Sequence, residues 1–327
     1  MSRIKFCALI VCLYLFACQT PNIAETPSAT PTATQTSAPP ATATSTPTLT
    51  PTPAPLARRV LILSIDGLRP DAISLAPMPN LTSLMNRAAY TLSAQTVLPS
   101  ATLPAHTSML SGLCPSKHGV NWNDYLPENG YANVTDIFDI AHAAGLQTVM
   151  VVGKEKLRQI AEPASIDIFE YINDRDLVIT EKLIANFPAD FDLLLIHFPT
   201  ADWMGHVYGW LSGEQLSVLY RADQALGNLL AELEARGLRD ETLIIVTADH
   251  GGHGTIHGSS LPEDMTIPWI AAGPGIQPTQ LVTPVHIMDT AATAAYALGL
   301  SIPAEWDGVP VYEAFGLPVE DQSTACQ

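Results

Sequence analysis

Five nearly continuous runs of apolar residues mark the strands that the sequence predicts. They span residues 59–65, 147–152, 191–196, 242–246 and 267–271. Because Val, Ile and Leu fill these runs with few polar residues between them, each strand should be buried on both faces. Such strands are typical of a parallel sheet that is covered by helices.

Stretches with helical periodicity separate these runs. The clearest begins near Ser212, repeats leucines at spacings near three, four and seven, and stops at Gly237, a residue typical of helix ends. Segments 78–90, 133–145 and 286–299 are predicted to be helices as well. Strands and helices alternate, so we expect a doubly wound α/β domain with a mostly parallel central sheet and helices on both faces.

Candidate metal ligands follow three of the predicted strands. They are Asp66 after the first run, Asp202 and His206 in a short predicted loop after the third, and Asp249 and His250 after the fourth. Sites in such sheets lie at the carboxyl ends of the strands, and Asp and His are common ligands of zinc. The sequence therefore predicts a metal site at this edge. The alternative is a Gly-rich loop with incidental histidines.

A hydroxyl group lies next to a predicted helix start. Thr102 belongs to the segment 98–112, in a loop just before a helix that is predicted over 105–110. Backbone N–H groups at a helix start are free and favour negative charge, so a hydroxyl there is placed to act on an anion. The alternative interpretation of the same residue is a helix cap.

The first 18 residues have the pattern of a secretory signal. A basic start precedes an apolar run, 6–17, that is too short to span a bilayer, and Leu-Phe-Ala-Cys18 resembles the bacterial lipobox. Cys18 would then be lipidated; a plain signal anchor is the alternative. Residues 19–55 are almost wholly Thr, Pro, Ala and Ser, which is typical of a disordered tether. We expect a lipid-anchored, extracytoplasmic protein of the cell envelope with its folded domain over 56–327.

The overall charge limits the classes of partner. The 327 residues include 32 Asp and Glu against 15 Lys and Arg, a net charge of −17. Because no stretch is rich in Lys or Arg, we expect no nucleic-acid-binding face; a small anionic substrate would need a metal to supply positive charge locally. Cys114 and Cys326 are the two ordinary thiols outside the predicted signal, and the sequence leaves their pairing and the oligomeric state open.

Several short motifs, taken in order, resemble one known family. They are Asp66-Gly-Leu-Arg-Pro-Asp71, Thr102-Leu-Pro-Ala-His106, Cys114-Pro-Ser-Lys-His-Gly-Val120, the Asp202 to His206 spacing, Asp249-His250-Gly251 and His257-Gly258. The series resembles that of the type I phosphodiesterase/nucleotide pyrophosphatase family, within the alkaline phosphatase superfamily, from about Val60 to the Gly308 region. Order and spacing carry the resemblance, because each fragment alone is weak.

The resemblance implies a phosphoric ester hydrolase that cleaves diester or anhydride bonds with two zinc ions, or other divalent ions, about 4 Å apart. It assigns one ion to Asp202, His206 and His257, and the other to Asp66, Asp249, His250 and the oxygen of Thr102. Thr102 would be the nucleophile that gives a phospho-threonine intermediate. Asn123 would donate a hydrogen bond to a phosphoryl oxygen. Three carboxylates against two zinc ions leave one surplus positive charge, which favours the threonine alkoxide.

Particular residues keep alternatives open. His253 competes with His257 for one ligand position, and the family's placement of a His-Gly segment favours His257. Asn123 is neutral and suits a diester monoanion, whereas Lys154 and Lys156 resemble lysines of phosphonoacetate hydrolases and are candidate substrate-binding residues, unless they are solvated surface lysines. The alternative functions are a phosphomonoesterase or phosphonoacetate hydrolase-like enzyme on the same scaffold, and a tethered lipoprotein that binds metal or ligand without turnover.

Overall fold

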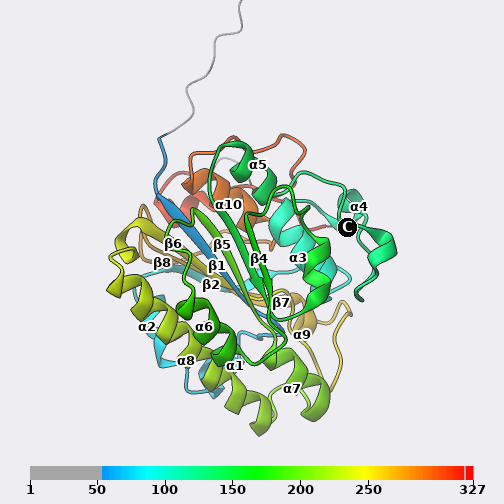
Figure 1. Cartoon of the computed structure of the whole chain (residues 1–327). Coiled ribbons are helices and arrows are strands. Elements are labelled where there is room, and N and C mark those ends of the chain that lie inside the picture. Colours follow the sequence, from blue (N-terminus) through cyan, green and yellow to red (C-terminus); the bar gives the residue numbers. More distant parts are fainter. Residues whose placement is uncertain (1–53, 320–321, 327) are drawn as a thin grey trace, which may run out of the picture. The chain divides into compact units, whose positions relative to one another are not determined.

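An eight-stranded sheet forms the centre of the described fold (Figure 1). The computed structural model describes residues 54–319 and 322–326, and the strand order is β4-β3-β5-β1-β6-β7-β2-β8. β7 runs antiparallel to β6 and β2, and all other neighbouring strands are parallel. The bounds are β1 Arg59–Ile65, β2 Ala89–Gln95, β3 Thr148–Val152, β4 Ile168–Tyr171, β5 Leu193–Phe198, β6 Thr242–Thr247, β7 Thr266–Ala272 and β8 Thr279–Gln280.

The central strand β1 determines where the carboxyl-end residues meet. It pairs in parallel with β5 on one side and with β6 on the other, so that Ile65 lies opposite Phe198 and Ser64 opposite Thr247. Every residue of β1, β5 and β6 is buried. The three strands end at one edge of the sheet, and the residues that follow them are therefore brought together. This arrangement confirms the predicted α/β fold.

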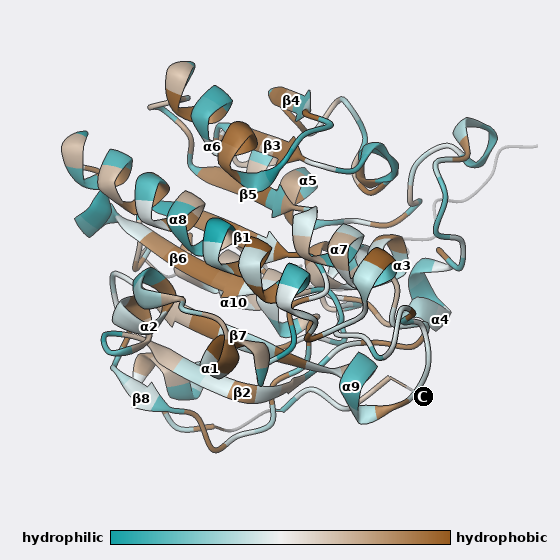
Figure 2. Ribbon diagram, turned by 90° about the horizontal axis from the view of Figure 1, so that it is seen from below, coloured by the Kyte–Doolittle hydropathy of each residue, from teal (hydrophilic) through white to brown (hydrophobic). Residues whose placement is uncertain are grey.

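Helices cover both faces of this sheet. α2, α6 and α8 pack together on one face, and α3, α5 and α10 pack together on the other (Figures 1 and 2). The bounds are α1 Ala72–Leu75, α2 Pro79–Met85, α3 Thr102–Ser111, α4 Pro115–His118, α5 Ile137–Ala143, α6 Asp176–Ala185, α7 Thr200–Tyr208, α8 Gly213–Ala235, α9 Pro262–Met265 and α10 Asp289–Ala297. As predicted, α8 begins near Ser212, which caps the helix because its hydroxyl oxygen accepts the N–H of Gln215.

The predicted helix over 78–90 was wrong beyond its first half. Helix α2 ends at Met85, and the chain then forms strand β2, in which buried and half-buried side chains mostly alternate. β2 lies next to the short edge strand β8. Its sequence, Ala-Tyr-Thr-Leu-Ser-Ala-Gln, lacks the long apolar run that marked the central strands, because it is not buried on both faces along its length.

Two candidate site segments are helical rather than looped. The predicted loop after β5 is helix α7, which places Asp202 and His206 one turn apart on the same side of the helix. Thr102 is the first residue of α3, after the extended residue Ala101, rather than part of a loop before the helix. Both corrections bring the functional candidates onto rigid elements.

The predicted signal peptide 1–18, with Cys18, lies outside the described residues, as does all but the end of the predicted tether. Within the part of the chain that is described, no helix is long and apolar enough to cross a membrane. Cys114 and Cys326 form a disulfide, with their Cα atoms 5.5 Å apart. This bond ties the segment between α3 and α4 to the C-terminal segment.

Candidate active site

Three aspartates meet at the carboxyl edge of the sheet. Asp66 directly follows β1, Asp249 follows β6, and Asp202 lies in the first turn of α7, just after β5. Their exposed fractions are 0% for Asp66 and Asp249 and 2% for Asp202. Buried carboxylates are costly unless cations or hydrogen bonds compensate them. The cluster therefore requires positive charge from its surroundings.

Three histidines turn their Nε2 atoms toward these carboxylates and their Nδ1 atoms away from them. The Nδ1 atoms of His206, His250 and His257 lie 2.9, 2.8 and 2.8 Å from backbone carbonyl oxygens. A carbonyl oxygen only accepts, so Nδ1 carries the proton in each neutral ring and Nε2 keeps its lone pair. Metal-ligating histidines are commonly held in this way by a hydrogen bond from the other ring nitrogen.

One group of candidate ligands combines α7 with the loop after β6. The Nε2 atoms of His206 and His257 lie 3.4 and 3.6 Å from Oδ1 of Asp202. One ligand atom from each of the three residues can be chosen so that all lie within 4.8 Å of one another. The ring of His257 also stacks on that of His250 at 3.8 Å. This is the set that the resemblance assigned to one ion.

A second group lies at the end of β1. Asp66, Asp202 and His250 place ligand atoms within 4.8 Å of one another, and Nε2 of His250 lies 3.5 Å from Oδ1 of Asp66. Asp249 is adjacent, with its Oδ2 at 3.3 Å from Nε2 of His250. The resemblance placed Asp249 in this set, whereas the geometry puts Asp202 within reach of both groups.

The unpaired atoms of these residues test whether a metal fits. Asp66 Oδ1, Asp202 Oδ1, Asp249 Oδ2 and His250 Nε2 are buried and have no hydrogen-bond partner in the described structure. With His250 in the tautomer above and the three aspartates ionised, all four are acceptors, so they cannot satisfy one another, whereas a cation satisfies them all. Carboxylate oxygens and imidazole nitrogens are ligands typical of zinc. The residues present therefore fit a metal centre.

Thr102 and Asn123 lie beside this cluster. Thr102 is 1% exposed, and its Oγ1 accepts a hydrogen bond from Nζ of Lys154 at 3.2 Å. Oδ1 of Asn123 accepts the backbone N–H of Leu103, the next residue of α3, at 2.9 Å. That bond fixes the amide next to Thr102 and leaves its NH₂ group as a donor. The predicted nucleophile and the predicted phosphoryl-binding amide are thus brought together.

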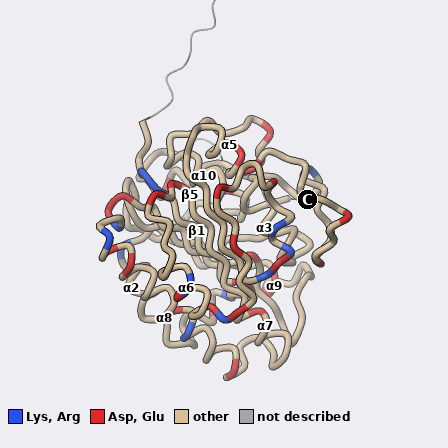
Figure 3. Tube along the Cα trace, in the orientation of Figure 1, with Lys and Arg blue, Asp and Glu red and all other residues tan. Residues whose placement is uncertain are grey.

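Lys154 supplies a cation at the centre of the cluster. Its Nζ lies 2.7 Å from Oδ2 of Asp66 and 2.5 Å from Oδ2 of Asp202. Burial disfavours the ammonium, but the two aspartates outweigh burial and raise the pKa of Lys154 above its usual range. Lys and Arg are spread thinly over the described fold (Figure 3). Lys156 forms no hydrogen bond or ion pair with a described residue, and burial, with the charge of Lys154, lowers its pKa.

Burial also sets the protonation of the other groups. It raises the pKa of Asp249 well above its usual range, and the charge of Asp66 adds to this rise. It lowers the pKa of His250, and it lowers that of His257 to about 4. Both histidines are therefore neutral at pH 7, the form that binds a metal.

Sequence reasoning missed the partner of Asp66. His197, near the end of β5, was not among the predicted site residues, and it is fully buried. Its Nδ1 accepts the N–H of Gly153 at 3.2 Å, so Nε2 carries the proton and donates to Oδ2 of Asp66 at 2.8 Å. Burial raises the pKa of Asp66, but Lys154 and His197 outweigh burial and hold it well below its usual range.

Two further histidines make other contacts. His253 places its Nδ1 2.7 Å from Oδ1 of Asp264 and belongs to neither candidate ligand group. His106 is fully buried; its Nδ1 donates to the carbonyl oxygen of Thr102 and its Nε2 lies near the hydroxyl of Ser64, both at 2.8 Å. His106 thereby ties the start of α3 to β1.

The fold and this cluster define an α/β protein with a candidate metal-dependent hydrolytic site. A model of the type I phosphodiesterase / nucleotide pyrophosphatase family matches residues 60–164 and 161–265, a range that contains every candidate ligand. The chain belongs to this family, which confirms the predicted membership and supports the predicted class of phosphoric ester hydrolase.

Curated relatives are longer proteins. The human GPI ethanolamine phosphate transferase 2, catalytic subunit, is 28% identical over 295 residues, which is 82% of this chain and 29% of the relative. A bis(5'-adenosyl)-triphosphatase of Xenopus laevis is 25% identical over 211 residues, 59% of this chain and 47% of the relative. The chain spans less than half the length of these relatives.

Solved structures share the fold. The murine ectonucleotide pyrophosphatase / phosphodiesterase 5, in complex with AMP, has a TM-score of 0.68 at 17% identity, covering 80% of this chain and 99% of that one. A phosphonate monoester hydrolase from Silicibacter pomeroyi has a TM-score of 0.63 at 17% identity, covering 81% of this chain and 78% of that one. At such identities the likeness concerns the fold alone.

Proposed function

We propose that the chain is a hydrolase that cleaves phosphodiester or phosphoanhydride bonds through a phospho-threonine intermediate at a binuclear zinc site. The observation that carries this proposal is the set of unpartnered, buried ligand atoms beside the hydroxyl of Thr102. One ion would be held by Asp202, His206 and His257, and the other by Asp66, Asp249, His250 and Thr102. Bound zinc would supply positive charge that lowers the pKa of a hydroxyl or water at the site.

The reaction that follows uses Thr102 as the nucleophile. Its Oγ1 forms a bond to phosphorus in line with the leaving oxygen, the bond from phosphorus to that oxygen breaks, and the leaving group takes up a proton. The hydroxyl proton of Thr102 passes to solvent. A water then attacks phosphorus, the bond to Oγ1 breaks, and the hydroxyl is restored as the phosphate product leaves. This scheme requires no histidine as general base.

Asn123 supports a diester rather than a monoester. Its free NH₂ group donates to a phosphoryl oxygen without adding charge, and the bond from Leu103 N–H to its Oδ1 holds it in place. A diester carries one negative charge and needs less compensation than a monoester dianion. The AMP complex of the murine ectonucleotide pyrophosphatase / phosphodiesterase 5 supports a small phosphoester as the substrate.

Lys154 supports a second candidate function. Its ammonium group lies 3.2 Å from Oγ1 of Thr102, where an additional negative charge on the substrate would be stabilised. A phosphomonoesterase, or an enzyme that acts on phosphonoacetate with Lys154 and Lys156 binding the carboxylate, is therefore the alternative on the same scaffold. A bis-aryl phosphate, an aryl phosphomonoester and phosphonoacetate, compared at equal concentration, separate these functions. A strong preference for the monoester or phosphonoacetate would refute the diesterase proposal.

The role of Thr102 is tested by removing its hydroxyl. Thr102→Ala should keep about two zinc ions per chain by elemental analysis and lose hydrolysis by on the order of a thousandfold or more. Thr102→Ser, which keeps a hydroxyl, should retain much of the activity. If Thr102→Ala hydrolyses the diester at the parent rate, Thr102 is not the nucleophile. Zinc binding without turnover of any of the three substrates by the parent would favour the tethered, non-catalytic lipoprotein instead.

We also propose an extracytoplasmic, lipid-anchored location. The disulfide between Cys114 and Cys326 supports it, because structural disulfides persist mainly in oxidising compartments. The sequence ending in Cys18 supplies the proposed anchor. Cys18→Ala should move the protein from the membrane fraction to the soluble fraction. Retention of that variant on membranes would argue for a plain signal anchor.

A further inference from the structure

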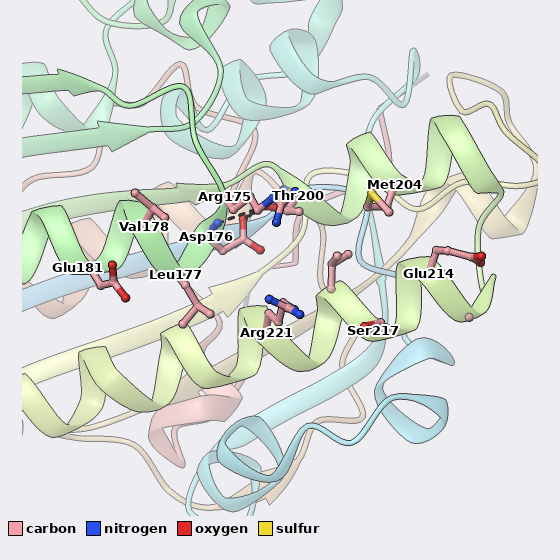
Figure 4. A pocket seen from close by; sticks show the side chains of 12 residues that line it. Arg175, Asp176, Leu177, Val178, Glu181, Thr200, Met204, Glu214, Ser217 and Arg221 are labelled. Atoms are coloured by element: carbon pink, nitrogen blue, oxygen red, sulfur yellow. Dashed lines mark hydrogen bonds between the residues drawn. The ribbon is translucent and has the colours of Figure 1, made fainter.

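A cavity of about 700 Å³ lies between α6, α7 and α8, away from the candidate active site (Figure 4). None of the seven candidate metal ligands lines it. It reaches the active-site region only through α7, which contributes Thr200 and Met204 to the cavity and Asp202 and His206 to the metal groups. We call this cavity the α6–α8 groove.

The walls of the groove are partly apolar. Leu177 and Val178 of α6, Met204 of α7 and Val218 of α8 line it and are half-buried. These side chains come from three separate helices and leave a space that none of them fills. A ligand that covers apolar area left partly open to water is stabilised by about 25 cal/mol per Å² of that area. The groove therefore favours a ligand with an apolar part.

Two arginines are the cations of the groove, whose lining also includes the carboxylates of Asp176, Glu181 and Glu214. Arg175, at the start of α6, and Arg221, on α8, both line it. Neither guanidinium forms a hydrogen bond or ion pair with another described residue, whereas Arg236, directly after the last residue of α8, pairs with Glu232 at 2.6 Å. Figure 4 shows Arg175 and Arg221 on opposite walls in the middle of the groove, with Glu181 and Glu214 toward its two ends. Asp176 also lines the middle of the groove, but it is 2% exposed and its Oδ1 accepts the N–H and the hydroxyl of Thr200. The two guanidinium groups are therefore the charged groups without a partner in the middle of the groove.

We propose that the α6–α8 groove binds a phosphate ester with an apolar alkyl or aryl substituent. Each guanidinium presents five N–H donors in a planar fork. Two forks that face one space suit a phosphoryl group, with its three or four oxygens, better than a carboxylate, which has two. The apolar walls on either side of the arginines receive the substituent. This binding site is separate from the proposed zinc site and does not depend on it.

Calorimetric titration of the full-length Thr102→Ala chain with decyl phosphate tests the proposal, because this variant is not expected to turn the ligand over. Arg221→Ala and Arg175→Ala should each weaken binding by on the order of tenfold. Arg236→Ala is the matched control, since it removes an arginine just after the end of the helix that carries Arg221 and outside the groove, and it should bind as the parent does. Because both groove arginines are exposed, neither substitution should affect folding.

The apolar half of the proposal has its own test. Alkyl phosphates of increasing length should bind more tightly by up to about fourfold per CH₂ until the groove is filled. Inorganic phosphate and decyl maltoside, which present the anion or the chain alone, should bind much more weakly. Equal binding of decyl phosphate by the parent, Arg221→Ala and Arg175→Ala would place the ligand elsewhere, such as at the zinc site, and overturn the proposal. So would binding of decyl maltoside at the same strength.

Discussion

Two clusters of aspartate and histidine in the described fold can be compared, one at the carboxyl edge of the sheet and one where α10 meets the C-terminal segment. In the second cluster, the Ser323 hydroxyl donates to Oδ2 of Asp289 at 2.9 Å and accepts from Nδ1 of His286 at 2.7 Å. Oδ1 of Asp289 accepts the N–H of Val309 at 3.0 Å. None of these side chains has a buried polar atom without a partner.

The clusters share residue types but differ in how their acceptors are satisfied. At the sheet edge, four buried atoms of Asp66, Asp202, Asp249 and His250 have no partner among the described residues. A buried polar atom left unpaired costs about 1–3 kcal/mol, and more if it is charged. The C-terminal cluster is complete as it stands, whereas the cluster at the sheet edge needs a cation in addition to Lys154. Unsatisfied acceptors, rather than the presence of Asp and His, therefore distinguish a candidate metal site from a structural cluster.

Asp202 should give the largest effect, because it reaches both groups of candidate ligands. Asp202→Asn keeps the size of the side chain and removes its charge, so zinc should fall from about two ions per chain to about one or less. Loss of a residue that only supports a metal ligand costs about 10- to 100-fold. Diester hydrolysis by Asp202→Asn should fall by more than that. The matched control is Asp289→Asn, which alters the other cluster and should keep both ions and the activity. Full zinc content in Asp202→Asn would contradict the shared role of Asp202.

His197 should give a smaller effect, because it would act on the metal only through Asp66. Its hydrogen bond holds Oδ2 of Asp66 and leaves Oδ1 without a partner. His197→Leu removes this bond and should weaken zinc affinity, measured by competition with a chelator, by about 10- to 100-fold. His197→Gln should recover part of the loss, since its amide nitrogen can donate to Asp66. Unchanged affinity in His197→Leu would make His197 a packing residue only.

A buried histidine outside the cluster controls for loss of packing and of a hydrogen bond. His118 is 6% exposed, and its Nε2 lies 3.0 Å from the hydroxyl of Ser108. His118→Leu should change stability without changing zinc affinity. If it weakens zinc binding as much as His197→Leu does, the effect is a general one of destabilising the fold.

Five candidate ligands were predicted to meet because each follows a strand whose burial is visible in the sequence, whereas His257 and the oxygen of Thr102 were assigned only by the resemblance. Asp66 and Asp249 come after the apolar runs of β1 and β6, and parallel pairing brings the ends of those strands together. The spacing of Asp202 and His206, four residues apart, also fits one face of a helix, so helix α7 had a signal that was overlooked.

The supporting contacts were not predictable in the same way. His197 reaches Asp66 across 131 residues, because the register of β1 and β5 sets His197 opposite Ser64, two residues before Asp66. No local pattern distinguishes His197 from a core histidine. Lys154 was only one of two lysines after β3, and the direction of its side chain is set by tertiary packing. The groove depends on three helices, of which only α8 was predicted, so its arginines could not be related to each other.

Substitution of Asp289 should give the smallest effect, and it should change stability rather than zinc binding. Burial raises its pKa from 3.8 to about 6. Between pH about 4 and 6 the folded protein therefore holds a proton that the unfolded chain has lost, and the free energy of unfolding falls as pH rises through this window, by up to about 3 kcal/mol. Asp289→Asn removes this contribution, so its stability, measured by urea unfolding across the window, should fall less with rising pH than that of the parent.

The difference between the stability-against-pH curves of the parent and of Asp289→Asn isolates the contribution of Asp289 from that of groups that titrate in the same pH range. Asp176, whose pKa burial also raises to about 6, contributes equally to both proteins. His118 acts in the opposite direction, because burial lowers its pKa to about 4 and its stabilising contribution is lost as pH falls from 6.5 toward 4. Parallel curves would mean that Asp289 keeps an ordinary pKa. Its hydrogen bonds would then hold the charged form, as a cation is expected to do for the carboxylates at the sheet edge.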